Sequence, residues 1–220
     1  MLTGFLRAIL QLTDSRLTSI LIRVVFLSML VFVALWIGLA YLLNSEAMTE
    51  IPVVNWLIGA LGGVVAIVAT LFLFPVVVSV ILGFYLEPIA AAVEAKYYPN
   101  LPEPKGVGVM GGAWAGVRFF LKALVVNLVL LVFLFAPALY PFAWMLANGY
   151  LLGREYFELV AFRRLSAGEA RGLRHTHRWA TLFGGIVGTL LFLVPIVNLL
   201  APVILTMAMV HPVERWRSKN

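Results

Sequence analysis

Long apolar runs separated by short polar segments dominate the pattern of this sequence. The first run, Val24 to Ser45, extends for 22 residues without a charged side chain, which is enough to cross about 30 Å of hydrocarbon at about 1.5 Å per helical residue. The second run, Ile51 to Leu86, extends for 36 residues and as one helix would reach about 54 Å, so we expect it to tilt or to protrude. Both runs predict transmembrane helices.

Two later runs are too long for one membrane crossing and too short for two. Ala123–Gly153 is uncharged for 31 residues with Pro137 and Pro141 near its middle, and Trp179–Val210 is uncharged for 32 residues with Pro195 at its centre. Helical hairpins that penetrate half of the bilayer, with their tips at the prolines, fit both lengths. Two kinked, tilted spans or four thin spans are the alternatives.

The placement of charge favours hairpins or four packed spans. The block Asn148–Arg178 carries six of the 16 basic residues. If it lies on the same side as both termini and residues 87–122, with Glu46 and Glu50 on the other side, all 16 basic residues share one face with eight acids, a balance of +8. The positive-inside rule makes that face cytoplasmic. A single kinked span in each late run would place the six arginines outside.

Composition agrees with a membrane protein. Hydrophobic residues make up 63% of the chain and charged residues 12%, which is incompatible with a soluble globular domain of this size. There are no cysteines, so disulfides and thiolate chemistry are excluded. We therefore predict an all-α integral membrane protein with two long transmembrane helices, two half-penetrating helical hairpins and an N-terminal interfacial helix.

The chain is expected to form a single membrane domain. Its expected segments are an interfacial helix at 1–18, a first span at 19–45, a second span at 51–86 that continues to about 97, a first hairpin at 113–165, a cytoplasmic amphipathic helix at 166–178 and a second hairpin at 179–212.

Pairs of glycines four residues apart predict close contacts between helices. Gly59 with Gly63 and Gly184 with Gly188 have this spacing, which lets two helix backbones approach closely. For the second pair, the contact could be made within one chain or between chains.

The polar block has helical chemistry of its own. Ser166 and Glu169 form a capping-box pattern, so a helix is expected to begin near Ala167. Arg171, Arg174 and Arg178 would then share one helical face. Such a basic stripe favours contact with anionic lipid over a specific substrate site.

Ionisable groups close to apolar runs need partners. Arg154 with Glu158, and Glu155 beside them, predict a salt-bridge network at the end of the first hairpin. Glu87 is a further candidate for such a pair. Arg23 and Arg118 stand at the starts of a span and of a hairpin, where the same requirement applies.

No pattern of an enzyme, a metal site or a cofactor site is evident. The motif Gly106-x-Gly108-x-x-Gly111 resembles a dinucleotide fingerprint, but it lacks the preceding strand, so we interpret it as a connector. His175 and His177 would point to different sides of a helix, so we interpret them as solvated surface. We expect no catalytic residues, no metal, no cofactor and no nucleic-acid partner.

Several segments resemble a known family. The run Ala143–Ala147, Tyr150 and the polar stretch to Arg178, then Leu193–Val203 and Ala208–Val210, are similar to the C-terminal half of the CysZ sulfate permeases and the wider etoposide-induced-protein domain family. The segment from Leu86-Glu87-Pro88-Ile89 to Val93-Glu94 is similar to that family's exit from its second long helix. The resemblance covers about two thirds of the chain.

The resemblance implies a bacterial inner-membrane protein with cytoplasmic termini that forms a homo-oligomer and admits sulfate for cysteine synthesis. It also implies an anion site at a Gly-x-Arg-Arg turn before the first span, where this chain instead reads Asp14-Ser15-Arg16-Leu17. A path for sulfate or a similar oxyanion would use partly desolvated arginines. The candidates for anion binding or pore lining are Arg16, Arg23, Arg118 and Arg154.

A different class of function remains open. The protein could bind anionic membrane lipids or a partner subunit through its basic cytoplasmic face without transporting anything. If it transports, the absence of an ATP-binding motif in this sequence favours a channel or coupling to an ion gradient.

Overall fold

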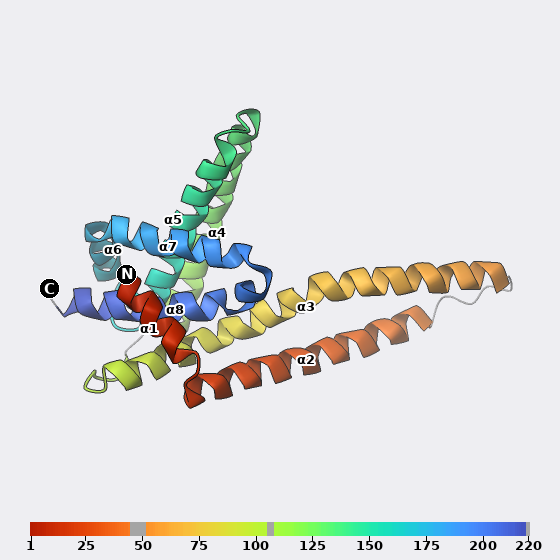
Figure 1. The fold of residues 1–220 in the computed structure, drawn as a ribbon, viewed down its shortest axis with the longest axis horizontal. Coiled ribbons are helices and arrows are strands. Elements are labelled where there is room, and N and C mark those ends of the chain that lie inside the picture. The colour runs from red at the N-terminus through yellow and green to blue at the C-terminus, as the bar shows by residue number, and fades with distance from the viewer. Residues whose placement is uncertain (45–51, 105–107, 219–220) are drawn as a thin grey trace. The chain divides into compact units, whose positions relative to one another are not determined.

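The structure is a computed structural model that describes residues 1–44, 52–104 and 108–218. Within these residues all regular structure is helical, and Figure 1 shows the helices in chain order. They are α1 Leu2–Gln11, α2 Ser15–Asn44, α3 Pro52–Tyr97, α4 Gly108–Val132, the 3-10 helix η1 Phe133–Phe135, α5 Tyr140–Ala161, α6 Ala167–Thr176, α7 Arg178–Leu193 and α8 Pro195–Arg217. The chain is an all-α integral membrane protein, as the sequence predicts.

Among the described residues, four helical segments are long and apolar enough to cross a membrane. They are Ser15–Gly38, Leu73–Tyr97, Val117–Phe135 and Val197–Arg217. The loop with Glu46 and Glu50, and Gly106 of the glycine motif, lie outside the described residues. Gly108 begins α4, so the second half of that glycine motif is helical and is not part of the expected connector.

The chain divides into two compact units, and each is described by itself. The Thr18–Tyr85 unit contains most of α2 and the first part of α3. Phe32 of α2 packs edge to face on Phe74 of α3, with ring centroids 5.3 Å apart. The α3 helix continues through Pro75, whose carbonyl accepts a hydrogen bond from the Ser79 hydroxyl at 2.7 Å.

The predicted glycine contact in α3 is not formed by Gly63. No atom lies within 4 Å of the position that a Cβ would take there. Gly59 lies outside the residues whose side-chain surroundings are described. The close helix contact predicted for Gly59 and Gly63 is therefore not made at Gly63.

The second unit, Met1–Leu17 with Leu86–Asn220, is built from two helical hairpins. In the first, α4 and α5 lie side by side and are joined by η1 and a turn that contains Pro137 (Figure 1). In the second, α7 and α8 pack together and are joined at Val194, whose extended backbone ends α7 just before Pro195. The prolines break the two late apolar runs where the sequence predicts.

Glycines bring α5 and α7 into close contact. A Cβ added to Gly185 of α7 would overlap the backbone of Gly149 and Gly153 on α5. Gly188 faces the Leu205 side chain of α8, and its added Cβ would lie 2.7 Å from that side chain. The tight contact predicted around Gly184 and Gly188 is therefore made within one chain.

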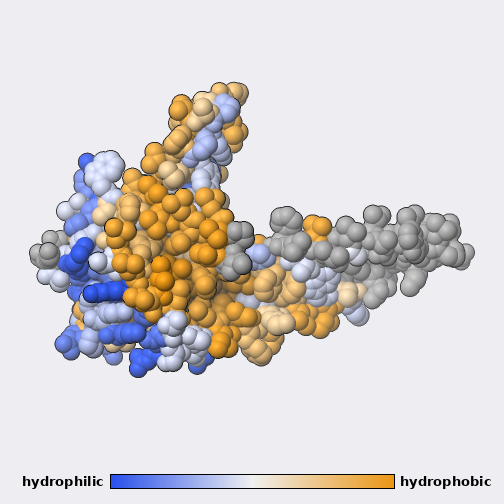
Figure 2. Space-filling view, viewed as in Figure 1, coloured by the Kyte–Doolittle hydropathy of each residue, from blue (hydrophilic) through white to orange (hydrophobic). Residues whose placement is uncertain are grey.

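The first helix, α1, packs on α8. A Cβ on Gly4 would lie 2.6 Å from the Ala208 carbonyl oxygen, and Phe5 is buried. The opposite side of α1 exposes large apolar residues. These are Leu2, Leu6, Ile9 and Leu10. Figure 2 shows polar surface gathered around α6 and the C-terminal end of α8, next to a wide apolar surface on this unit.

Candidate anion site and buried ion pairs

A buried arginine on α5 shares its carboxylate with a second arginine. Arg154 Nε and Nη2 donate to the two Glu158 oxygens at 2.8 and 3.1 Å, one helical turn away. Arg174 of α6 approaches the same carboxylate, with Nε 3.5 Å from Oε1. We call these three residues the Arg154 cluster. The predicted Arg154–Glu158 pair is confirmed.

The Arg154 cluster holds more positive than negative charge. Its two guanidinium groups face one carboxylate, and Arg154 is only 4% exposed. Arg154 Nη1 and Arg174 Nε are buried without a hydrogen-bond partner among the described residues. Glu155 makes no ion pair within that part of the chain, so its predicted place in the network is not seen. An unpaired buried donor with surplus charge favours an anion.

A second group of ion pairs joins the ends of α3, α5 and α8. Arg163 binds both oxygens of Glu94, with Nε and Nη2 at 2.9 and 3.1 Å, and its Nη1 also pairs with Glu87. Arg164 Nη2 lies 2.6 Å from Glu94 Oε2 and its Nε lies 3.6 Å from Glu214 Oε1. These five residues form the Arg163–Arg164 cluster. Three carboxylates face two guanidinium groups, so the cluster has no surplus positive charge and is suited to holding helices together.

Most of this second cluster was not predicted from the sequence. Only Glu87 was a candidate, and its partner was not named. Glu94 follows Glu87 by seven residues, which places the two on one helical face, and that spacing was the available signal. Arg163 and Arg164 lie about 70 positions from Glu94, so sequence alone could not pair them.

The other anion-site candidates are not joined to Arg154. Arg118 is exposed, and its guanidinium lies 5.3 Å from the centre of the Trp114 ring. Arg16 is exposed at the start of α2. Arg23 is exposed on the part of α2 that belongs to the other unit. No ion pair or hydrogen bond links Arg16 or Arg118 to the Arg154 cluster in the described residues.

The carboxylate of Asp14 lies in the turn before α2, where the family resemblance implies an anion site. Asp14 Oδ1 accepts a hydrogen bond from the Arg16 backbone N–H at 3.0 Å, and Oδ2 pairs with Lys96 Nζ at 2.7 Å. The hydrogen bond from Lys96, and then that from Arg16, hold the pKa of Asp14 below its usual value. The free N–H groups of a helix start attract anions. Here Asp14 already supplies one.

The predicted basic stripe is not one helical face. The predicted capping box of Ser166 and Glu169 is present, and hydrogen bonds with Ser166 hold the pKa of Glu169 below its usual value. However, α6 ends at Thr176 and Arg178 begins α7. Arg174 turns inward to Glu158. Only Arg171 and Arg178 remain exposed, and they lie on different helices.

His177 is packed and is not solvated surface as expected. Its ring stacks on Trp216 of α8, with centroids 4.0 Å apart and an interplanar angle of 12°. Its Nδ1 lies 3.1 Å from the Leu173 carbonyl. His175 is exposed. Across the described ranges, no group of three or more His, Asp or Glu residues could hold a metal.

These features define a class of protein: a polytopic helical membrane protein with arginines buried at its helix ends. Residues 4–202 match the family described as Sulfate transporter CysZ/Etoposide-induced protein 2.4. The chain belongs to this family. A comparison with curated proteins gives no match.

Proposed function

We propose that the protein is a permease or channel that admits sulfate, or a similar tetrahedral oxyanion, across the bacterial inner membrane. The sulfate would be assimilated into cysteine. The observation that carries this proposal is the Arg154 cluster, in which two arginines share one buried carboxylate. Family membership supports the substrate class.

The chemistry of the Arg154 cluster suits an oxyanion. A guanidinium presents several N–H donors in a planar fork that matches the geometry of sulfate or phosphate oxygens. Arg154 Nη1 has no hydrogen-bond partner in the described residues, so this donor is available, whereas Arg174 Nε already faces Glu158 Oε1 at 3.5 Å. Glu158 neutralises only part of the charge, which allows the anion to bind and also to leave.

The length of α7 supports a hairpin topology for the second late run, although α8 is long enough to cross. The α7 helix has 16 residues and spans about 24 Å, which is less than the hydrocarbon core of a bilayer. The α4 helix has 25 residues and is long enough to cross the bilayer, so the first hairpin could extend deeper into the bilayer than the second. We propose one membrane domain with both termini and α6 on the cytoplasmic side, and a homo-oligomeric assembly.

Contact with anionic lipid is the second candidate function. Arg171 and Arg178 are exposed, and the Arg178 guanidinium lies 5.4 Å from the centre of the Trp179 ring. Exposed arginine beside exposed tryptophan is typical of a headgroup surface. This contact is compatible with transport and could also be the whole function.

Uptake of radiolabelled sulfate into proteoliposomes that contain the purified protein tests the proposal. We expect saturable uptake that unlabelled sulfate competes away and that chloride competes away poorly. Phosphate as a second competitor measures selectivity among tetrahedral oxyanions. Uptake equal to that of empty liposomes, with the protein folded and inserted, would leave lipid or partner binding as the function.

A further inference from the structure

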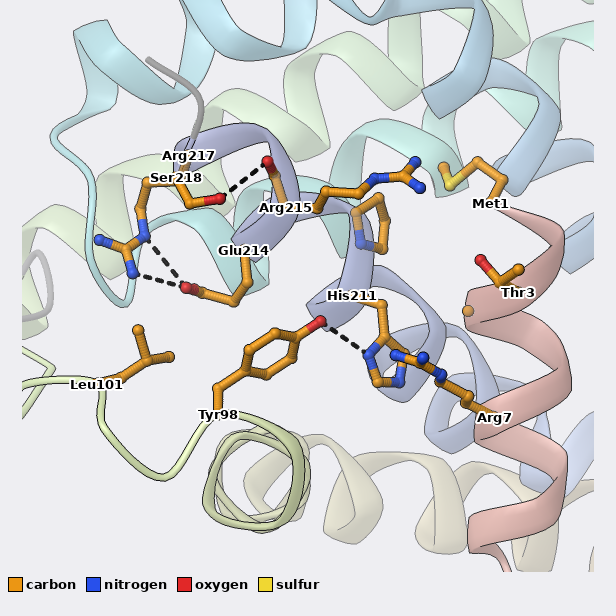
Figure 3. Close-up of a pocket in the computed structure, with 12 residues that line it drawn as sticks. Met1, Thr3, Arg7, Tyr98, Leu101, His211, Glu214, Arg215, Arg217 and Ser218 are labelled. Atoms are coloured by element: carbon orange, nitrogen blue, oxygen red, sulfur yellow. Dashed lines mark hydrogen bonds and ion pairs between the residues drawn. The ribbon is translucent and has the colours of Figure 1, made fainter.

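A pocket of about 470 Å³ lies within the larger unit, apart from the Arg154 cluster. It is a partly open pocket between α1, the segment that follows α3 and the C-terminal end of α8 (Figure 3). The polar residues that line it include Thr3, Arg7, Tyr98, His211, Glu214, Arg215 and Arg217. None of them belongs to the Arg154 cluster.

The pocket has more positive than negative charge. Three arginines and one glutamate line it. Glu214 is bound by Arg217, with Nη2 2.6 Å from Oε2 (Figure 3). Arg7 and Arg215 stand at the exposed rim and have no carboxylate partner in the part of the chain that the structure describes. Two arginines are therefore left to attract an anion.

His211 adds a buried ring nitrogen without a hydrogen-bond partner to the same pocket, among the described residues. Its side chain is buried, with the residue 6% exposed, and its Nδ1 lies 3.1 Å from the Tyr98 hydroxyl (Figure 3). If the hydroxyl donates to Nδ1, the neutral imidazole carries its proton on Nε2. That nitrogen has no hydrogen-bond partner among the described residues. A buried donor without an acceptor is costly, and an anionic ligand would supply the acceptor.

We propose that this pocket binds an organic phosphate. The volume of the pocket is in the range of sites for small organic ligands and exceeds what a bare oxyanion needs. Arg7, Arg215 and His211 are placed to hold the phosphate group, and Tyr98 and Leu101 line the space for the organic part. The phosphate can belong to a soluble monoester or to a phospholipid headgroup.

Binding in this pocket would affect the Arg163–Arg164 cluster, because Glu214 both lines the pocket and belongs to that cluster. Its carboxylate pairs with Arg217 and also lies 3.6 Å from Arg164. If a bound phosphate attracts Arg217 away from Glu214, the ion pair of Glu214 with Arg164 remains. The site is therefore placed to influence how α8 is held to the ends of α3 and α5, and it does so independently of any transported anion.

Equilibrium dialysis of the full-length protein in detergent with radiolabelled glycerol 3-phosphate tests whether the pocket binds a soluble phosphate monoester. The double variant Arg7→Gln/Arg215→Gln is expected to weaken binding at least tenfold, because each arginine contributes charge-assisted hydrogen bonds. The matched control in this arm is Arg171→Gln/Arg178→Gln, which removes two exposed arginines outside the pocket and should bind glycerol 3-phosphate as the wild type does. An unchanged thermal unfolding midpoint shows that the double variant is folded.

Nanodiscs of phosphatidylglycerol or phosphatidylcholine test the lipid source, with retained lipid counted by native mass spectrometry. Selective loss of phosphatidylglycerol from the double variant, without glycerol 3-phosphate binding by the wild type, identifies a headgroup as the ligand. Binding that is equal in wild type and double variant in both arms would overturn the proposal, as would no binding in either. Arg154→Gln should keep wild-type binding here, which separates this site from the proposed transport site.

Discussion

Arg163 lies between two carboxylates and is 4% exposed. Arg163→Gln would leave Glu94 buried with Arg164 as its one ion-pair partner within the described ranges. We expect a loss of about 3 kcal/mol in the free energy of unfolding, because removing one partner of a buried ion pair leaves an uncompensated charge. Denaturant unfolding in detergent measures it.

Arg171→Gln is the control for that experiment, since Arg171 is exposed and, among the described residues, its side chain bonds only to the Ala167 carbonyl. Its change in stability should stay within about 0.5 kcal/mol. Equal losses in the two variants would contradict the role assigned to Arg163.

Asp14 offers a direct test of the turn before α2, because it is the one aspartate in the sequence. Selective carbon-13 labelling of aspartate therefore gives a single carboxyl resonance to titrate. Its pKa should lie below the ordinary value of 3.8 and should move back towards it in Lys96→Gln. A lowered pKa means that the ion pair stabilises the fold above about pH 4 and stops doing so as the pH falls through the lowered pKa. An identical pKa in both proteins would refute the pairing with Lys96.

At the residue scale, local spacing decides what the sequence can predict. Arg154 and Glu158 lie one helical turn apart, so their pair could be predicted. Arg163 and Glu94 are 69 positions apart, and only the fold brings them together. The sequence also did not predict the surplus positive charge of the Arg154 cluster, because Arg174 was expected on an exposed basic stripe and not beside Glu158.

At the scale of elements, the crossing of α5 and α7 depends on glycine. Gly185→Ala would place a Cβ against the backbone of Gly149 and Gly153, so the two helices would have to separate. We expect a loss of about 2 kcal/mol or more from this overpacking. Thermal or denaturant unfolding in detergent measures the change.

Gly172→Ala is the matched control on α6. No atom lies within 4 Å of its added Cβ, and alanine favours a helix over glycine by about 1 kcal/mol. This variant should therefore be slightly more stable than the wild type. If both alanines had the same effect, close packing at Gly185 would not be the cause.

Helix boundaries were predictable where the chemistry is local. Prolines and the capping box of Ser166 mark the breaks that the structure shows. The boundary between the amphipathic helix and the second hairpin was expected after Arg178, and the break lies at His177, where the sequence carries neither proline nor glycine. At this break the ring of His177 stacks on Trp216, a contact that depends on the fold.

At the scale of the whole molecule, the topology can be mapped with single cysteines, since the natural sequence has none. Ala138→Cys lies at the exposed turn of the first hairpin, and Gly168→Cys lies on α6. In oriented membranes, a membrane-impermeant maleimide should label Gly168→Cys from the cytoplasmic side alone. Ala138→Cys should resist the reagent from both sides if the hairpin ends within the bilayer. Rapid labelling from the outside would instead show that α4 and α5 span the membrane.

The most direct test of the central claim compares initial rates of sulfate uptake into proteoliposomes for wild type, Arg154→Gln and Arg171→Gln at matched protein content. Loss of the buried guanidinium removes its charge and donors, so Arg154→Gln should transport at least tenfold more slowly. Arg171→Gln should transport as the wild type does. A wild-type rate in Arg154→Gln, or an equal loss in both variants, would contradict an oxyanion path at the Arg154 cluster.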